Sequence, residues 1–330
     1  MGNAYLYSIL ATAAIFTLLA LALNIITGYA GQAMMGIAAF FGLGAYTAAI
    51  CTTNGVPFFA ALLIAMIVSG AFGVVLGVIS LRLQSDFLEI STIGIHFVMA
   101  AIFNTLKITG GTLGLTTSKP VIFGVRMNNF HFFILATILV VIVCLLITKM
   151  RHSWFGMALA SIENDPGAAR SFGINVSKYQ VLAFTIGTAV AGLAGGIYSH
   201  RMGFISSSDF AFVISIQIVS MCVIGGLGTL RGPVFGAVLL TFLPEVLRFA
   251  DIYRELVYAL LLVIMVRFMP GGLLGDDSPV WKLIVKVYRK FVPRKKTRAD
   301  LIAEKAQESK AIAEQEISPV ESAATEGGQA

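Results

Sequence analysis

The chain carries, at residues 163–175, the sequence ENDPGAARSFGIN, a polar stretch between long apolar runs. Asp165 with the proline and glycine that follow it is typical of a helix start, and Gly173 is typical of a helix stop. The stretch therefore predicts a short helix across the mouth of a bundle, with Ala168 and Ala169 small enough for another surface to approach closely. A solvated connector between two helices is the alternative, and composition alone favours it.

The composition excludes a soluble domain. Hydrophobic residues make up 57% of the chain and charged residues only 12%, and the first 81 residues contain no Asp, Glu, Lys or Arg. A helix needs about 20 apolar residues to cross a bilayer, and backbone groups in lipid must find their hydrogen bonds within the protein. Runs of this length therefore predict an all-α polytopic membrane protein.

The apolar runs predict about nine transmembrane helices, with eight to ten allowed by the pattern. Residues 28–36 and 225–236 leave the number open, because each glycine-containing stretch is either a break within a helix or a turn between two helices. The predicted spans begin near Tyr5, Met34, Phe58, Phe87, Phe130, Tyr179, Phe212, Val234 and Arg254.

Charge is concentrated near the C-terminus. Residues 282–298 contain eight basic and no acidic residues and interleave apolar side chains at helical spacing, which predicts an element on the membrane surface rather than a nucleic-acid site. Residues 300–330 contain seven acidic residues and few apolar ones. Three regions follow: a transmembrane domain at 1–278 that includes the polar loop at 153–178, a basic amphipathic juxtamembrane segment at 279–298 that contacts lipid, and an acidic tail at 299–330 that we expect to be disordered.

The same charges predict the orientation. Cytoplasmic segments carry an excess of Lys and Arg, so the basic tail and the loop that holds Lys149, Arg151, Arg170 and Lys178 are expected in the cytoplasm. Four predicted spans lie between loop and tail, which is consistent with one side for both. Five spans precede the loop, so the N-terminus is expected outside. No secretory signal is evident, and the first apolar run is expected to remain as a span.

The sequence offers no catalytic, metal or cofactor site. Cys51, Cys144 and Cys222 are far apart in apolar segments and lack the close spacing of a metal site. No Gly-Lys pair occurs, so the Walker A loop of nucleotide-hydrolysing proteins is absent. We therefore expect neither an enzyme nor a cofactor.

A few polar side chains within or beside the apolar runs are candidates for a translocation path, because such residues are costly in lipid and usually face water or protein. Four of them have a simpler alternative: Thr27 and Gln32 fit a short turn, Glu89 fits the interface, and His96 fits a structural hydrogen bond. Glu89 and His96 are seven residues apart and share a helix face. The full set is Thr27, Gln32, Glu89, His96 and Gln217.

Three motifs carry a family resemblance. Residues 153–173, the Gly-Gly-Ile-Tyr at 195–198 and the Gly-Gly-Leu-Gly-Thr-Leu-Arg-Gly-Pro at 225–233 resemble LivM-type permease subunits of branched-chain amino acid ABC importers. The likeness extends from about residue 24 to residue 270. It implies that the Ala-Ala loop is a cytoplasmic coupling helix docking on an ATPase. The residues implied in coupling are Glu163, Asp165, Ala168, Ala169, Arg170 and Gly173.

The resemblance further implies a permease of the bacterial inner membrane for branched-chain or other small hydrophobic amino acids. Its implied partners are a second, related permease subunit, two ATPase subunits and a periplasmic binding protein that delivers the ligand. A permease for urea or short amides is an open alternative, because such importers have similar sequences. An ion-coupled secondary transporter is disfavoured, since acidic residues deep within the apolar runs are scarce.

Overall fold

A computed structural model describes residues 2–80, 85–122 and 125–247, and a few residues between 257 and 278. Those few are Val257, Ala259, Leu260, Val263, Arg267, 272–275 and Ser278. The segments predicted at 279–298 and 299–330 therefore lie outside the described residues, and so do most residues of the span predicted near Arg254.

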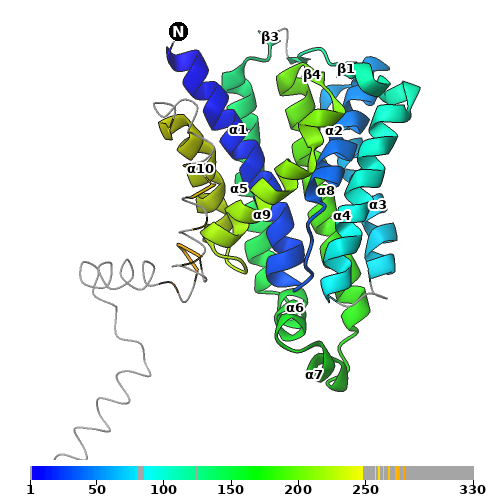
Figure 1. Cartoon of the computed structure of the whole chain (residues 1–330), viewed down its shortest axis with the longest axis vertical. Coiled ribbons are helices and arrows are strands. Elements are labelled where there is room, and N and C mark those ends of the chain that lie inside the picture. The colour runs from blue at the N-terminus through cyan, green and yellow to red at the C-terminus, as the bar shows by residue number, and fades with distance from the viewer. Residues whose placement is uncertain are drawn as a thin grey trace, which may run out of the picture. The chain divides into compact units, whose positions relative to one another are not determined.

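The described chain is a bundle of long helices (Figure 1). The long helices are α1 (Gly2–Leu23), α2 (Ile37–Thr53), α3 (Phe58–Ser80), α4 (Ser85–Thr105), α5 (Asn129–Arg151), α8 (Val176–Met202), α9 (Phe212–Gly225) and α10 (Arg231–Val246). A π-helical turn, η1 (Asn24–Tyr29), extends α1. Two shorter helices, α6 (Trp154–Asn164) and α7 (Pro166–Ser171), join α5 to α8.

The remaining elements are short. They are the 3₁₀ turns η2 (Lys107–Thr109), η3 (Gly111–Leu113) and η4 (Ser207–Phe210), and the strands β1 (Leu115–Thr116), β2 (Val121–Ile122), β3 (Val125–Arg126) and β4 (Phe204–Ile205). The antiparallel pairs β1–β4 and β2–β3 lie at the same end of the bundle as the N-terminus, which we name the strand end. Helices α6 and α7 lie at the opposite end, the loop end.

Six described helices are long and apolar enough to cross a membrane, and they begin at or near predicted positions. They are Ala4–Tyr29, Phe58–Ile79, Phe87–Thr105, Asn129–Arg151, Val176–Met202 and Ser207–Gly225. The span predicted near Met34 is the shorter helix α2, of 17 residues, and the one near Val234 is α10, of 16 residues. The chain is thus an all-α polytopic membrane protein, as its composition predicts.

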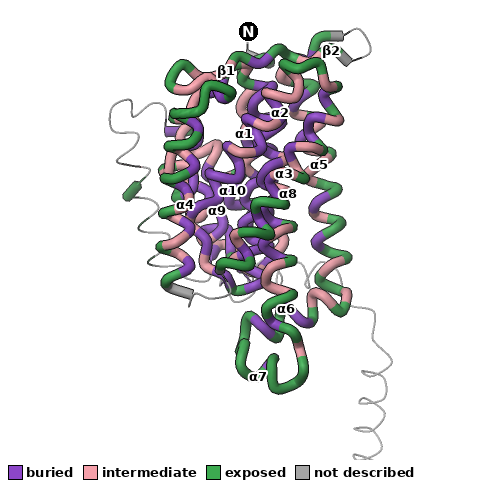
Figure 2. Tube along the Cα trace, turned by 90° about the vertical axis from the view of Figure 1, so that its right-hand side faces the viewer, coloured by how far each residue is buried: buried purple, intermediate pink, exposed green. Residues whose placement is uncertain are grey.

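Glycine-mediated contacts hold the centre of the bundle together. Helix α8 packs along α2 and α3, and α1 packs against α5, α8 and α10. A Cβ atom on Gly44 of α2 would overlap the backbone of Gly192 in α8, so these two helices approach each other as closely as backbones allow. Figure 2 shows the buried residues concentrated in these central helices, with exposed residues along α4, α5 and the loop end.

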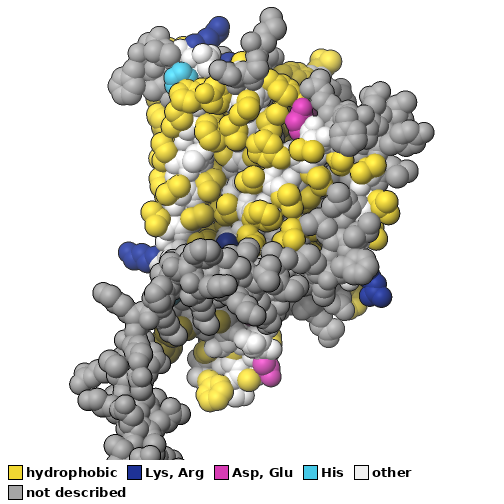
Figure 3. All heavy atoms as spheres, turned by 90° about the vertical axis from the view of Figure 1, so that its left-hand side faces the viewer, with side chains coloured by type: hydrophobic (Ala, Val, Ile, Leu, Met, Phe, Trp, Pro, Cys, Tyr) yellow, Lys and Arg dark blue, Asp and Glu magenta, His cyan; other side chains and the backbone are white. Residues whose placement is uncertain are grey.

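The outer surface of the bundle is apolar. Large hydrophobic side chains such as Ile67 of α3, Ile90 of α4 and Leu145 of α5 are more than half exposed. Figure 3 shows one such face, where hydrophobic side chains cover the bundle above the loop end. Exposed apolar patches this large suit contact with lipid or with other membrane helices.

Candidate functional site: two helix breaks and the loop beside them

The loop helix α7 begins and ends as the sequence predicts. Asp165 is the N-cap, and its Oδ1 accepts hydrogen bonds from the backbone N–H groups of Gly167 (2.7 Å) and Ala168 (3.0 Å). Pro166 occupies the first helical position, where its missing N–H costs nothing. Gly173 follows the helix with φ +79°, a left-handed conformation that favours glycine. The aspartate cap with its proline at one end and the glycine at the other therefore fix a six-residue helix at the tip of the loop end.

A small cluster of its own holds this loop together. Ile162 of α6, Ala169 of α7 and Val176 of α8 are buried against one another. Ala169 is 2% exposed, so its small side chain lets α7 approach the two neighbouring helices. Ala168 and Arg170 are exposed, and Phe172 is 86% exposed. Helix α7 thus buries one of its two alanines, and Phe172 directly after it presents an aromatic side chain outward.

The first predicted break, at residues 28–36, is a turn between helices that is itself packed in protein. The π-helical turn of α1 ends at Tyr29, Gly31 has φ +65°, and the chain then runs without helix to Ile37. Gln32 is 4% exposed and Thr27 is half-buried. Irregular backbone at membrane depth is tolerated only where protein or a cavity surrounds it, and this segment meets that requirement.

The second break, between α9 and α10, lies directly against the first. Asn24 joins them: its Nδ2 donates to the carbonyl oxygen of Thr229 (2.8 Å), and its Oδ1 accepts from the N–H of Gly228 (3.0 Å). Gly28 is so close to the second break that a Cβ atom on it would lie 2.6 Å from the nitrogen of Gly228. A single buried amide thus satisfies backbone groups of a segment about two hundred residues away.

Glu163 lies where the loop meets both breaks. A side chain added at Gly31 would come within 3.4 Å of the Cα of Glu163, and one added at Gly228 would come within 3.9 Å of its Oε1. Arg151, the last residue of α5, stacks over the Tyr29 ring with its Cζ 5.3 Å from the ring centroid. Four of these residues, Tyr29, Arg151, Glu163 and Gly228, line a cavity of about 210 Å³. Partial burial raises the pKa of the Glu163 carboxyl, and the charge of Arg151 offsets part of that rise.

A second group of polar atoms surrounds the N-termini of α2 and α9. The Oγ of Ser215 accepts from the N–H of Ala38 (3.0 Å), and the Oγ1 of Thr92 accepts from the N–H of Met35 (3.1 Å). His96, 2% exposed, lies one turn beyond Thr92 with its ring centroid 5.7 Å from that of Phe212. Its Nδ1 has no hydrogen-bond partner in the described part of the chain. His96 therefore lies within the bundle beside the first residue of α9.

The predicted site residues thus fall into separate places. Glu163 joins the two breaks, and Thr27 and Gln32 belong to the first break. His96 is in the group at the helix starts, whereas Glu89 lies two turns closer to the loop end and is half-buried, as is Gln217 of α9.

The sequence does not predict three of the residues found here. Asn24 is one amide at the end of an apolar run, and its partners are too distant in sequence to be inferred from spacing. Arg151 indicates orientation alone. Phe172 has a local signal, because a large aromatic residue in a polar loop suits a contact surface.

Comparison with known proteins agrees with the motifs. The family model described as the permease component of the branched-chain amino acid transport system matches residues 5–269. The high-affinity branched-chain amino acid transport system permease protein LivM of Salmonella typhimurium is 32% identical over 296 residues, which cover 82% of this chain and 70% of that protein. LivM of Escherichia coli K12 is 31% identical over the same coverage.

A second kind of permease is also similar. LivH of Escherichia coli K12 is 30% identical over 129 residues, which cover 38% of this chain and 41% of that protein. No solved structure matches the chain significantly. The relatives are transport permeases rather than enzymes. The chain belongs to the family of permease components of branched-chain amino acid transport systems.

Proposed function

We propose that this chain is the LivM-like permease subunit of an ABC importer in a bacterial inner membrane, and that α6 and α7 form its cytoplasmic coupling element. The observation that carries the proposal is the position of Glu163, which belongs to the exposed loop and lies beside both helix breaks. A force applied to the loop at this point would act on irregular backbone within the bundle. Such backbone can change conformation more easily than a continuous helix.

The topology that goes with this role has the loop end in the cytoplasm and the N-terminus outside. The basic residues Lys149, Arg151, Arg170 and Lys178 belong to the loop end, which supports that orientation by the excess of positive charge in cytoplasmic segments. Nine spans within residues 1–278, a lipid-contacting segment at 279–298 and a disordered cytoplasmic tail at 299–330 complete the proposed organisation.

The substrate class follows from the relatives, whose names specify branched-chain amino acids. We propose that the path passes the starts of α2 and α9, where His96 and Thr92 lie beside two helix N-termini. The positive ends of helix dipoles favour carboxylate groups, and the apolar residues nearby suit aliphatic side chains. Thr27, Gln32, Glu89 and Gln217 remain proposed path residues at other depths.

The partners are also proposals. The similarity of this chain to both LivM and LivH proteins of one organism supports a second, related permease subunit. Two ATPase subunits would dock at the loop ends of the permease pair, through Asp165, Ala168, Arg170, Gly173 and Phe172, with Ala169 acting from inside the loop. A periplasmic binding protein would deliver the amino acid to the strand end.

Phe172→Ala tests the coupling assignment. Because Phe172 is 86% exposed, its truncation removes no packing from the permease itself, so a change in assembly reports on a partner. An aromatic anchor in a protein interface contributes about 2 kcal/mol, so we expect roughly 30-fold weaker retention of the ATPase subunits during purification. Uptake of leucine into proteoliposomes should fall with it.

Leu113→Ala is the matched control. Leu113 is 85% exposed and apolar, but it lies at the strand end in η3. Its truncation should leave ATPase retention unchanged. If Phe172→Ala retains the ATPases as fully as the unaltered permease and supports normal uptake, the coupling assignment is wrong.

A further inference from the structure

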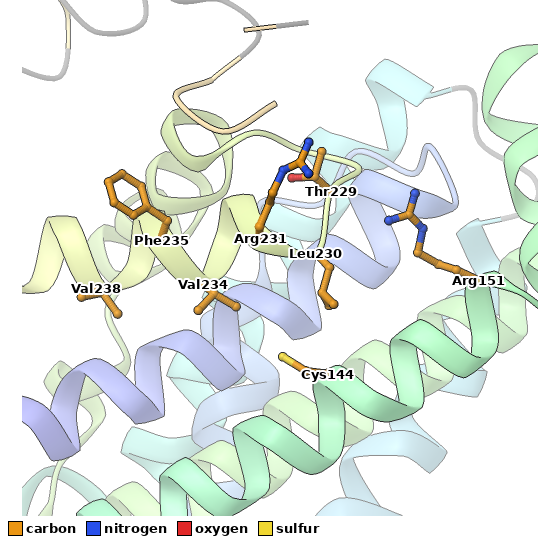
Figure 4. A pocket seen from close by; sticks show the side chains of 8 residues that line it. All are labelled: Cys144, Arg151, Thr229, Leu230, Arg231, Val234, Phe235 and Val238. Atoms are coloured by element: carbon orange, nitrogen blue, oxygen red, sulfur yellow. The ribbon is translucent and has the colours of Figure 1, made fainter. Parts of the chain in front are cut away.

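A groove between α5 and α10 has a basic mouth and an apolar interior. Its cavity is about 630 Å³ and lies at the loop-end part of these helices. Arg151 and Cys144 contribute from α5, and Arg231, Val234, Phe235 and Val238 contribute from α10. In Figure 4 both guanidinium groups lie on one side of the cavity, and Cys144, Val234 and Val238 lie on the other.

The apolar part of the groove continues toward the strand end. A second cavity of about 160 Å³ shares Val234 and Val238 with the first and is lined further along by Leu10 of α1 and by Phe133 and Val140 of α5. Arg151 and Val140 are eleven residues apart on α5, which corresponds to about 16 Å along the helix axis. One leaflet of a bilayer has a hydrocarbon depth of about 15 Å, so this length matches one acyl chain.

The mouth suits an anionic group. Arg231 is the first residue of α10, so the positive end of a 16-residue helix adds to the two guanidinium charges there. The Nε of Arg231 donates to the carbonyl oxygen of Leu274 (3.0 Å), which fixes its position at the groove. No acidic residue is among the described residues that line either cavity, although Glu163 borders the neighbouring one beyond Arg151. Guanidinium groups bind phosphate oxygens with two parallel hydrogen bonds.

We infer that this groove binds one anionic phospholipid of the leaflet at the loop end. The phosphate contacts Arg151 and Arg231, and an acyl chain lies along Val234 and Val238 toward Phe133. A helix from a partner subunit fits less well, because a helix is about 10 Å wide and the second cavity, of about 160 Å³, cannot accept it. Free phosphate would leave the apolar part of the groove unfilled. The inference rests on the membrane location of the bundle and not on the coupling role of the loop.

The test counts lipids that stay bound to the purified full-length permease, by native mass spectrometry, in detergent supplied with equal phosphatidylglycerol and phosphatidylcholine. We expect one phosphatidylglycerol to be retained preferentially. Arg151→Gln with Arg231→Gln should lower that retention at least about tenfold, because charge-assisted hydrogen bonds to the phosphate are lost. Val238→Trp, which fills the chain path and keeps both arginines, should lower retention of the same lipid.

Two controls keep the test decisive. Lys149→Gln removes a basic residue two positions before Arg151 that lines neither cavity, and it should leave retention unchanged. Arg151→Gln alone keeps the hydrogen bond from Arg231 to Leu274, and it should weaken retention even if the double variant folds poorly. The inference is overturned if folded arginine variants retain phosphatidylglycerol fully, or if a photoreactive residue at position 238 cross-links to the second permease subunit rather than to lipid.

Discussion

The two helix breaks and the loop beside them are both irregular, yet they are held in opposite ways. At the breaks, backbone meets backbone at Gly28 and Gly228, and Asn24 satisfies two polar groups of the facing segment. The loop's own cluster has only three buried side chains, with one capping aspartate beside it and an exposed surface around it. Water can satisfy exposed backbone groups but not buried ones, so the buried breaks must be tightly packed and the exposed loop need not be.

We expect Gly28→Ala to have the largest effect on stability, because the breaks are packed more tightly than the loop. Its new Cβ would lie 2.6 Å from the Gly228 nitrogen and would displace the amide of Asn24 from two backbone partners. Overpacking and the unsatisfied groups together should cost about 3–5 kcal/mol of unfolding free energy. Thermal unfolding of the purified permease, followed by intrinsic fluorescence, measures the loss.

Gly167→Ala in the loop is the matched control for that substitution. A Cβ there would meet only the Oδ1 of Asp165, at 3.1 Å, and alanine favours the helical conformation. The unfolding temperature should stay within a degree or so of the unaltered protein, since single helix propensities contribute about 1 kcal/mol at most. Equal effects at positions 28 and 167 would show that the breaks are no more tightly packed than the loop.

A smaller and more local effect is expected for Ala169→Glu. Ala169 is 2% exposed between Ile162 and Val176, so a carboxylate there must leave the cluster or stay poorly solvated, at a cost of about 2 kcal/mol. The loop should open without unfolding of the bundle. Limited proteolysis should therefore cut residues 153–178 faster, while the thermal transition of the helices stays in place. Ala168→Glu, at an exposed neighbour, should leave the cutting rate unchanged; equally fast cutting in both variants would contradict the buried cluster.

Glu163→Gln should have the smallest effect, and the effect should depend on pH. Partial burial raises the pKa of this carboxyl above its ordinary value of 4.5, so the folded protein resists its ionisation. Stability contributed by the protonated form is lost as pH rises from that ordinary value through the raised one. Glutamine cannot ionise, so the variant should unfold at a slightly higher temperature than the unaltered permease at neutral pH and at the same temperature near pH ~4. A difference that is independent of pH would assign the effect to packing instead.

Much of the fold could be predicted from local sequence. The charge-free apolar runs identified the helices, because only length and hydrophobicity decide whether a segment suits a bilayer. Asp165 and Gly173 marked the ends of α7 through interactions within a few residues. The pairing of Asn24 with Gly228 and Thr229 could not be predicted, because it depends on how helices far apart in sequence pack. The burial of Ala169 within the loop is unpredictable for the same reason, since a small residue suits a close contact on either side of a helix.

The Asn24 amide has a consequence for how the bundle can move. The amide nitrogen is a donor and the amide oxygen is an acceptor. The nitrogen faces a backbone carbonyl of the second break, and the oxygen faces a backbone N–H group there. An aspartate would repel the Thr229 carbonyl, and a leucine would leave both backbone groups without a hydrogen-bond partner. Neither replacement preserves the link. The two breaks are therefore linked through one side chain: α1 cannot tilt away from the break before α10 unless both hydrogen bonds break. A movement that begins at either break must therefore displace the other, so the two breaks move together.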